Sequence, residues 1–137
     1  MLPDVTVVGQ KDVYQNFAIK SLIKQLNLPI EVVIAPIIRD PDGLACSSRN
    51  VHLTQSERQD ATSIYQVLQE VASWKETEPI SYIKKYITYH IKSEYCYVDI
   101  CCSKTLKILD VLDREAVIII NAFFGKIELG DNIIIKS

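Results

Sequence analysis

The fold of this protein is decided by residues 4–39, which read DVTVVGQKDVYQNFAIKSLIKQLNLPIEVVIAPIIR. Residues 4–8 are β-branched and apolar and lead into Gly9, as in a short buried strand that ends in a loop. Apolar residues at helical spacing follow between positions 17 and 26, and a continuous apolar run of strand length extends from Ile30 to Arg39. Strand, helix and strand in this order predict a βαβ unit of a covered parallel sheet. Such a sheet needs more than two strands, so we expect this unit to finish a larger α/β domain.

The middle of the chain changes character at residues 40–50, DPDGLACSSRN, which are polar and rich in turn-forming residues. This segment is the best linker candidate. Thr54 and Glu57 have the spacing of a capping box, which predicts the start of a helix. A second helix is expected from Pro79, because proline is favoured at the first helical position.

The last third of the chain is strand-like. Residues 95–102 (YCYVDICC) and 116–124 (AVIIINAFF) are rich in side chains that suit a pleated surface. Gly125 and Lys126 can then turn the chain into a closing strand. The expected order is therefore a βαβ unit, a linker, two helices and a small antiparallel sheet.

Composition excludes several classes of protein. The chain has 137 residues, 48% hydrophobic and 23% charged, with Lys+Arg 15, Asp+Glu 17 and a net charge of −2. That is the size of one ordinary domain or two very small ones, and the apolar content is too high for disorder. The charge balance argues against nucleic-acid binding, and no apolar run reaches the ~18 residues of a membrane span. Without the features of a signal peptide at its start, the chain is expected in the cytoplasm, with neither nucleic acid nor membrane as a partner.

The four cysteines are Cys46, alone, and a cluster of Cys96, Cys101 and Cys102. Reduced thiols are the default for a chain that is not small and loop-rich. The cluster lacks the spacing of a zinc knuckle, and buried thiols behave as small hydrophobic side chains. We therefore favour packing in a strand over metal binding and expect no protein metal site.

One candidate site is VGQKDVYQNF, at the end of the first expected strand. Lys11 offers a mobile positive charge for phosphate. Asp12 can accept hydrogen bonds from hydroxyl groups, and Gln15 offers both donors and an acceptor. Gly9 would let a ligand approach the backbone. The alternative is that the Lys-Asp pair only caps the helix and compensates its dipole.

The other candidate site is GLACSSRN. Ser47 and Ser48 can donate to phosphate oxygens, and Arg49 can clamp a phosphate with two hydrogen bonds. The alternative is a solvated loop whose polar side chains bond their own backbone. Following two neighbouring parallel strands, the two segments would face one crevice, which suits nucleotide chemistry.

These segments resemble the pantothenate synthetase (pantoate–β-alanine ligase) family. The family's Gly-[Glu/Gln]-Lys-Asp-x-x-Gln is matched by residues 9–15. Its Pro-x-x-Arg-x-x-Asp-Gly-Leu-Ala-Met-Ser-Ser-Arg-Asn is matched by residues 36–50, with Cys46 in the Met position. HLTQSER, YVDICCSKTL and GKIELGDNIII are similar to later family segments. The resemblance spans essentially the whole chain and is to the C-terminal half of the family.

The resemblance implies a division of the chain. Residues 1–38 would be the C-terminal βαβ end of a Rossmann-like nucleotidyltransferase domain. Residues 39–50 would be a hinge with a phosphate loop. Residues 51–137 would be a small α+β lid domain with two helices and an antiparallel sheet.

The resemblance also implies a reaction, the ATP-dependent condensation of pantoate and β-alanine through a pantoyl adenylate, with Mg²⁺ sharing the phosphate charge. It implies contacts with the ATP phosphates by Lys11, Ser47, Ser48 and Arg49. The ribose would be contacted by Asp12 and the Gly9 backbone, and the adenine by the backbones of Ile38 and Cys46. Pantoate would be bound by Gln15.

This sequence departs from the family in several ways. Glu128 stands where the family has arginine, so the final strand is expected to pack differently. The family's N-terminal half, with its His-x-Gly-His segment against ATP, has no counterpart in these residues. We therefore expect little ligase activity from this chain alone, and either self-association or a need for the N-terminal half. The alternative is a non-catalytic module, derived from the lid domain, that binds a nucleotide or a protein partner.

Overall fold

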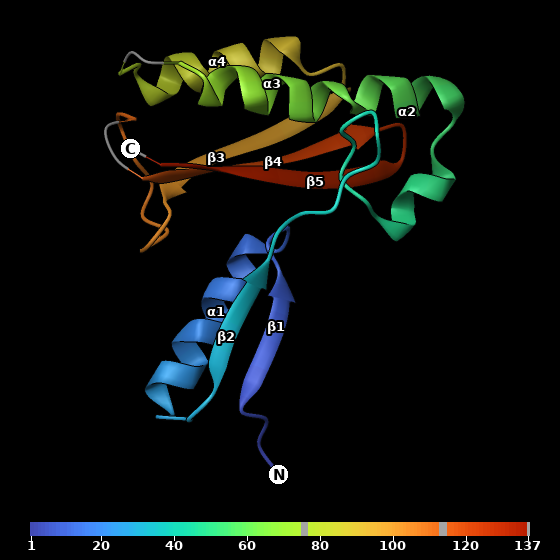
Figure 1. Ribbon diagram of the computed structural model, residues 1–137. Helices are drawn as coiled ribbons and strands as arrows, with labels where there is room; N and C mark the ends of the chain where they lie inside the picture. The colour runs from blue at the N-terminus through green and yellow to red at the C-terminus, as the bar shows by residue number, and fades with distance from the viewer. Residues whose placement is uncertain (75–76, 113–114, 137) are drawn as a thin grey trace. The chain divides into compact units, whose positions relative to one another are not determined.

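The computed structural model describes residues 1–74, 77–112 and 115–136, and its α/β architecture follows the expected order of elements (Figure 1). The chain divides into two compact units, Met1–Ile38 and Arg39–Ser137. Among the described residues, no helix has the length and apolar character needed to cross a membrane.

The first unit is the predicted βαβ element. Strands β1 (Val5–Gly9) and β2 (Glu31–Ala35) pair in parallel, and helix α1 (Val13–Gln25) connects them. The apolar run that begins at Ile30 was expected to continue as a strand to Arg39, but β2 ends at Ala35. Pro36 follows, and a proline has no N–H to donate to a sheet.

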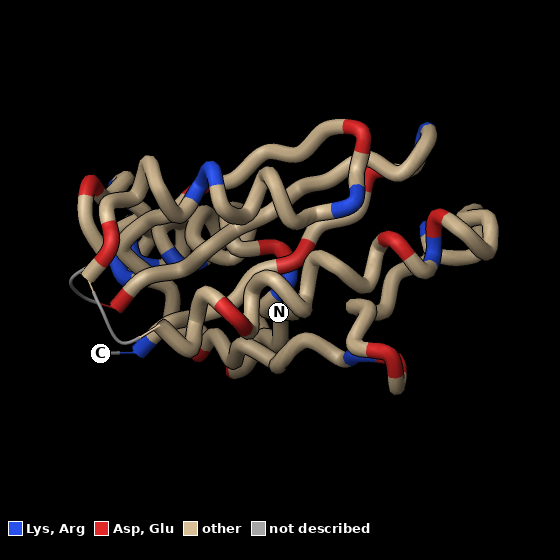
Figure 2. Tube along the Cα trace, turned by 90° about the horizontal axis from the view of Figure 1, so that it is seen from above, with Lys and Arg blue, Asp and Glu red and all other residues tan. Residues whose placement is uncertain are grey.

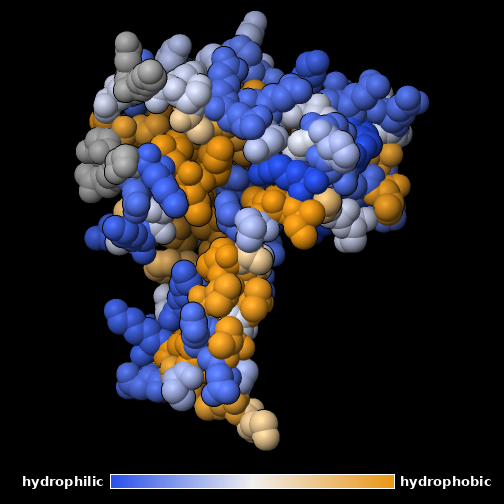
Figure 3. Space-filling view, in the orientation of Figure 1, coloured by the Kyte–Doolittle hydropathy of each residue, from blue (hydrophilic) through white to orange (hydrophobic). Residues whose placement is uncertain are grey.

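The apolar side chains of the first unit are more exposed than the sequence pattern suggests. Asn16 is its only buried residue, whereas Val7 is 65% exposed and Leu22 is 55% exposed. In Figure 3 the hydrophobic residues of this unit form much of its visible surface. Two strands and one helix leave large parts of their apolar surface without a second layer to cover them.

The second unit begins with its helices. A 3₁₀ helix (η1, Ser48–His52) precedes α2 (Gln55–Ala61), α3 (Ser63–Ala72) and α4 (Ile80–His90). The capping box of Thr54 and Glu57 is confirmed at the start of α2. The first of the two expected helices is divided into α2 and α3 at Thr62, whose N–H bonds Gln59 with a three-residue step instead of continuing the α-helical ladder.

The antiparallel sheet is confirmed, with the order β3 (Tyr95–Cys102), β4 (Ala116–Phe124) and β5 (Ile127–Ile135). Helices α3 and α4 cover one of its faces (Figure 1). The core lies between these two layers, and its largest fully buried apolar side chains include Ile64, Leu68, Ile83, Ile87, Ile100, Ile118 and Ile120.

The clustered cysteines lie in a strand, as the sequence predicts. Cys96, Cys101 and Cys102 all lie in β3, where Cys101 is buried and Cys96 packs against the core. All four cysteines of the chain are outside disulfides. Basic and acidic residues are interspersed along the chain instead of gathering by sign (Figure 2).

Candidate functional site

The first candidate segment forms the turn between β1 and α1. Gly9 is the last residue of β1, Lys11 and Asp12 follow in the turn, and Gln15 lies in the first turn of α1. Asp12 occupies the N-cap position, but its side chain makes no capping hydrogen bond. Helix capping therefore does not account for the carboxylate of Asp12.

Asn16, which sequence reasoning missed, holds this turn in place. Its side-chain Nδ2 donates to the carbonyl of Gly9 at 2.6 Å, and its backbone N–H donates to the carbonyl of Asp12 at 2.9 Å. The N–H of Gln10 donates to Ala35 at 2.8 Å and ties the turn to β2. A polar residue on the apolar side of the predicted helix was the available signal. Beside Gly9 there is open space, since a Cβ there would meet nothing within 4 Å.

The second candidate segment, Ser47–Arg49, starts the 3₁₀ helix of the second unit. Ser47 Oγ accepts from the N–H of Arg49 at 3.2 Å, and Asn50 Nδ2 donates to the carbonyl of Ala45 at 3.1 Å. Ser47 and Asn50 therefore bond the loop's own backbone, as the alternative of a solvated loop predicts. Ser48 and Arg49 are exposed, and Arg49 also donates from Nη1 to the carbonyl of Glu128 at 3.0 Å.

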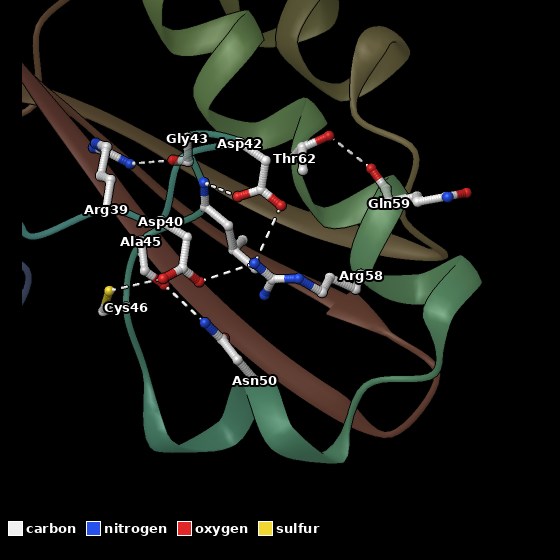
Figure 4. A network of polar contacts seen from close by, with 11 residues as sticks. Arg39, Asp40, Asp42, Gly43, Ala45, Cys46, Asn50, Arg58, Gln59 and Thr62 are labelled. Atoms are coloured by element: carbon white, nitrogen blue, oxygen red, sulfur yellow. Dashed lines mark hydrogen bonds and ion pairs between the residues drawn. The ribbon is translucent and has the colours of Figure 1, made fainter.

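The linker before this segment is fastened by Arg58 of α2 (Figure 4). Arg58 Nη2 contacts Asp40 Oδ2 at 2.9 Å and Asp42 Oδ2 at 3.1 Å, and the Cys46 thiol donates to Asp40 Oδ1 at 3.5 Å. The hydrogen bond from Arg58, followed by that from the Cys46 thiol, lowers the pKa of Asp40. The same pairing with Asp40 raises the pKa of Arg58.

An open hollow of about 310 Å³ lies beside this network and is lined by Asp40, Cys46, Ser47, Asn50, Val51 and Arg58. Two of the predicted site residues, Cys46 and Ser47, thus border one hollow within the second unit. The other predicted residues of this unit are the exposed Ser48 and Arg49. Ile38, the last residue of the first unit, is 75% exposed.

Sequence reasoning also missed the side chains that hold the second loop. Arg58 lies in the family segment HLTQSER, but the segment does not predict its contacts. Arg39 forms an ion pair with Asp131 that no local sequence pattern predicts. In the parts of the chain that the structure describes, no group of three or more His, Cys, Asp or Glu could hold a metal ion.

Comparison with known proteins gives a consistent result. Residues 1–134 match the family model described as pantoate-beta-alanine ligase. Pantothenate synthetases from Caldicellulosiruptor bescii and Geobacillus kaustophilus are each 37% identical to the chain, and their matches include 98% and 99% of it. Those matches include 50% and 47% of the two relatives, so the chain spans about half the length of the curated relatives it matches.

Solved structures agree with this relationship. The pantothenate synthetase of Thermus thermophilus superposes with a TM-score of 0.85 at 28% identity, over 98% of this chain and 51% of that one. A pantoate-beta-alanine ligase from Francisella tularensis, described as complexed with beta-gamma ATP and β-alanine, gives a TM-score of 0.66 at 26% identity, over 98% and 45% of the two chains. With its fold, both loop segments and nearly all of its length matched, the chain belongs to the pantoate–β-alanine ligase family.

Proposed function

We propose that this chain is the C-terminal portion of a pantothenate synthetase, the enzyme that joins pantoate and β-alanine at the expense of ATP. The observation that carries the proposal is the family match over residues 1–134, which contains both candidate loops. The Francisella relative, described as complexed with beta-gamma ATP and β-alanine, supports ATP as a substrate.

The proposed reaction has two steps. A carboxylate oxygen of pantoate attacks the α-phosphorus of ATP, the bond from that phosphorus to the bridging oxygen breaks, and pyrophosphate leaves. The amine of β-alanine then attacks the acyl carbon of the pantoyl adenylate. AMP leaves, the nitrogen loses a proton and pantothenate is formed.

The phosphates are assigned to Lys11, Ser47, Ser48 and Arg49. The charge that builds on departing pyrophosphate would be stabilised by donors that are already fixed in place. Ser47 Oγ accepts from the Arg49 N–H and keeps its own proton to donate. Arg49 uses Nη1 on the carbonyl of Glu128, and its fork of five N–H groups has further donors for phosphate.

The remaining substrate contacts are assigned by position in the family segments. The Asp12 carboxylate, which makes no capping bond, would accept from the ribose hydroxyls, and the open space beside Gly9 would admit the sugar. The backbones of Ile38 and Cys46 would contact adenine, and Gln15 would bind pantoate. No cysteine has a catalytic role in this scheme.

Mg²⁺ is implied by the ATP chemistry of the family. Mg²⁺ at such sites is usually bound through substrate phosphates and one or two carboxylates. When bound, it would neutralise part of the charge on the triphosphate. Lys11 and Arg49 would supply the remaining positive charge from the protein.

The partner that we propose for the first unit is the N-terminal half found in the relatives, with self-association when that half is absent. Among the described residues, the parallel sheet has only β1 and β2, and Val5, Val7 and Val33 are exposed on it. An isolated pair of strands is marginal in water. The absence of disulfides among the four cysteines fits a reducing compartment such as the cytoplasm.

The first experiment is calorimetric titration of the whole chain with ATP and Mg²⁺. We expect binding that Lys11→Ala weakens at least tenfold and that Lys20→Ala, at an exposed lysine within α1, leaves unchanged. Equal affinities in the two variants would contradict the assigned phosphate contact.

The second experiment mixes the chain with a polypeptide that carries the N-terminal half of a relative. AMP should form only when pantoate and β-alanine are both present. An associated pair that binds ATP but forms no AMP would exclude the ligase and support the binding-module alternative.

A further inference from the structure

The side chain of Arg39, the first residue of the second unit, is held on several sides. Its Nη1 and Nη2 contact Oδ2 and Oδ1 of Asp131 at 2.6 and 2.8 Å, a bidentate ion pair. The guanidinium carbon lies 3.6 Å from the centre of the Tyr65 ring, and Nη1 also donates to the carbonyl of Gly43 at 3.2 Å. The side chain of Asp131 is only 3% exposed and that of Arg39 is 17% exposed.

The partners of Arg39 are themselves fixed. Asp131 Oδ1 also accepts from the backbone N–H of Asn132 at 2.8 Å, a second contact that restrains the carboxylate. Gly43 has a φ of +90°, and a Cβ on it would come within 2.7 Å of Cδ1 of Tyr65. Turn, aromatic ring and guanidinium therefore pack so closely that glycine is required at position 43.

The contacts of Arg39 are connected through Ala45 to the Ser47–Arg49 segment. Arg39 forms an antiparallel bridge with Ala45, which is buried, and the carbonyl of Ala45 accepts from the side chain of Asn50. At the far end of the segment, Arg49 donates to the carbonyl of Glu128. Both ends of the loop are thus tied to β5, at residues that stand about 10 Å apart along a strand.

We propose that Arg39 and Asp131 are positioning residues, which hold Ser47–Arg49 in register with β5 and so orient its donors toward the ATP phosphates. The orientation toward phosphate rests on the proposed function, whereas the effect on the loop does not. A buried ion pair adds little net stability compared with apolar side chains of similar volume. Arg39 and Asp131 instead fix a geometry, because their two parallel hydrogen bonds form only when the guanidinium and the carboxylate are aligned.

The main variant is the double substitution Arg39→Met with Asp131→Leu, which removes the ion pair without burying a lone charge. We expect the fold to persist, amide hydrogen exchange at residues 43–50 to accelerate at least tenfold, and exchange in β4 to stay as in the wild type. ATP affinity of the whole chain should fall at least tenfold.

Arg39→Lys keeps the charge but loses the planar fork, so its ATP affinity should lie between those of the wild type and the double variant. Lys104→Met, which removes an exposed ion pair with Glu115 at 3.5 Å, is the matched control and should change neither measurement.

Two results would overturn the positioning role. One is wild-type exchange at residues 43–50 in the double variant. The other is a parallel loss of protection in the loop and in β4, which would reveal a purely structural effect. A loosened loop with unchanged ATP affinity would overturn the link to phosphate. Should the wild-type chain bind no ATP at all, the proposed function fails, while the exchange result still decides the role of Arg39 and Asp131.

Discussion

At the scale of single residues, one arginine organises the linker electrostatically. Arg58 contacts both Asp40 and Asp42, and the thiol of Cys46 adds a weaker hydrogen bond to Asp40. These side chains are a third or more exposed, so solvent screens the attraction and the ion pairs add little to global stability. Their effect is local, because they determine how the linker lies against α2.

The lowered pKa of Asp40 leads to a prediction about pH. A depressed folded pKa means that the Asp40–Arg58 contact contributes at pH values above the ordinary aspartate value of about 4 and is lost as the pH falls through the folded value. In Arg58→Met, which removes the first cause of the shift, the pKa of Asp40 should rise toward about 4. The measurement is an NMR titration of the Asp40 carboxyl carbon. Lys104→Met should leave the midpoint unchanged, and an unchanged midpoint in Arg58→Met would refute the assignment.

At the scale of helices and strands, the sequence predicts the features that depend on neighbouring residues. It does not predict those that depend on residues far apart in the chain. The bounds of β3 and β4 were predictable because runs rich in β-branched and aromatic residues favour a pleated strand. The start of α2 was predictable because a capping box is complete within four residues. The division at Thr62 was not, because the apolar stripe continues across it.

Parts of the candidate site were equally beyond local patterns. The glycine, lysine and serine types of the two loops stand out in the sequence because they suit phosphate chemistry. The ion pair of Arg39 with Asp131 joins residues 92 positions apart, and neither residue lies in a periodic pattern that would link it to the other. The contact depends on where β5 lies in the folded sheet, which no local pattern specifies.

The layered core of the second unit gives a prediction at this scale. Ile118, in the central strand, is fully buried under the helices, whereas Ile134 of β5 is 42% exposed. Ile118→Ala should lower the free energy of unfolding by about 2–5 kcal/mol, because it removes buried methyl groups and leaves a cavity. Ile134→Ala is the control and should cost less than about 1.5 kcal/mol. Chemical denaturation followed by circular dichroism measures both, and equal losses would show that the sheet is not buried as described.

At the scale of the whole molecule, the two units differ in how well they bury their apolar residues. The second unit has a continuous core between helices and sheet, whereas the first unit buries only Asn16 among its described residues. Thirty-eight residues are too few to form a stable core without further support. We therefore expect the first unit, unlike the second, to pack against another polypeptide surface.

We accordingly predict that the wild-type chain self-associates through the sheet of the first unit. Val7, on β1, is 65% exposed, and a lysine on an exposed strand opposes pairing between sheets. Val7→Lys should shift the sedimentation-velocity distribution toward monomer at a concentration where the wild type is associated. Ile108→Lys, at a position of the second unit that is 71% exposed, is the matched control. A monomeric wild type, or equal shifts in both variants, would contradict this assignment.

The ion pair between Arg39 and Asp131 also has a consequence for biosynthesis. The ribosome makes Arg39 92 residues before its partner, so the loop that follows Arg39 cannot be tied down while the nascent chain still lacks β5. Contacts of such long sequence separation form late in folding. A chain terminated by a premature stop codon just before Ile127 would retain every predicted ATP-contacting residue and lack β5, the strand that holds the Ser47–Arg49 loop in place.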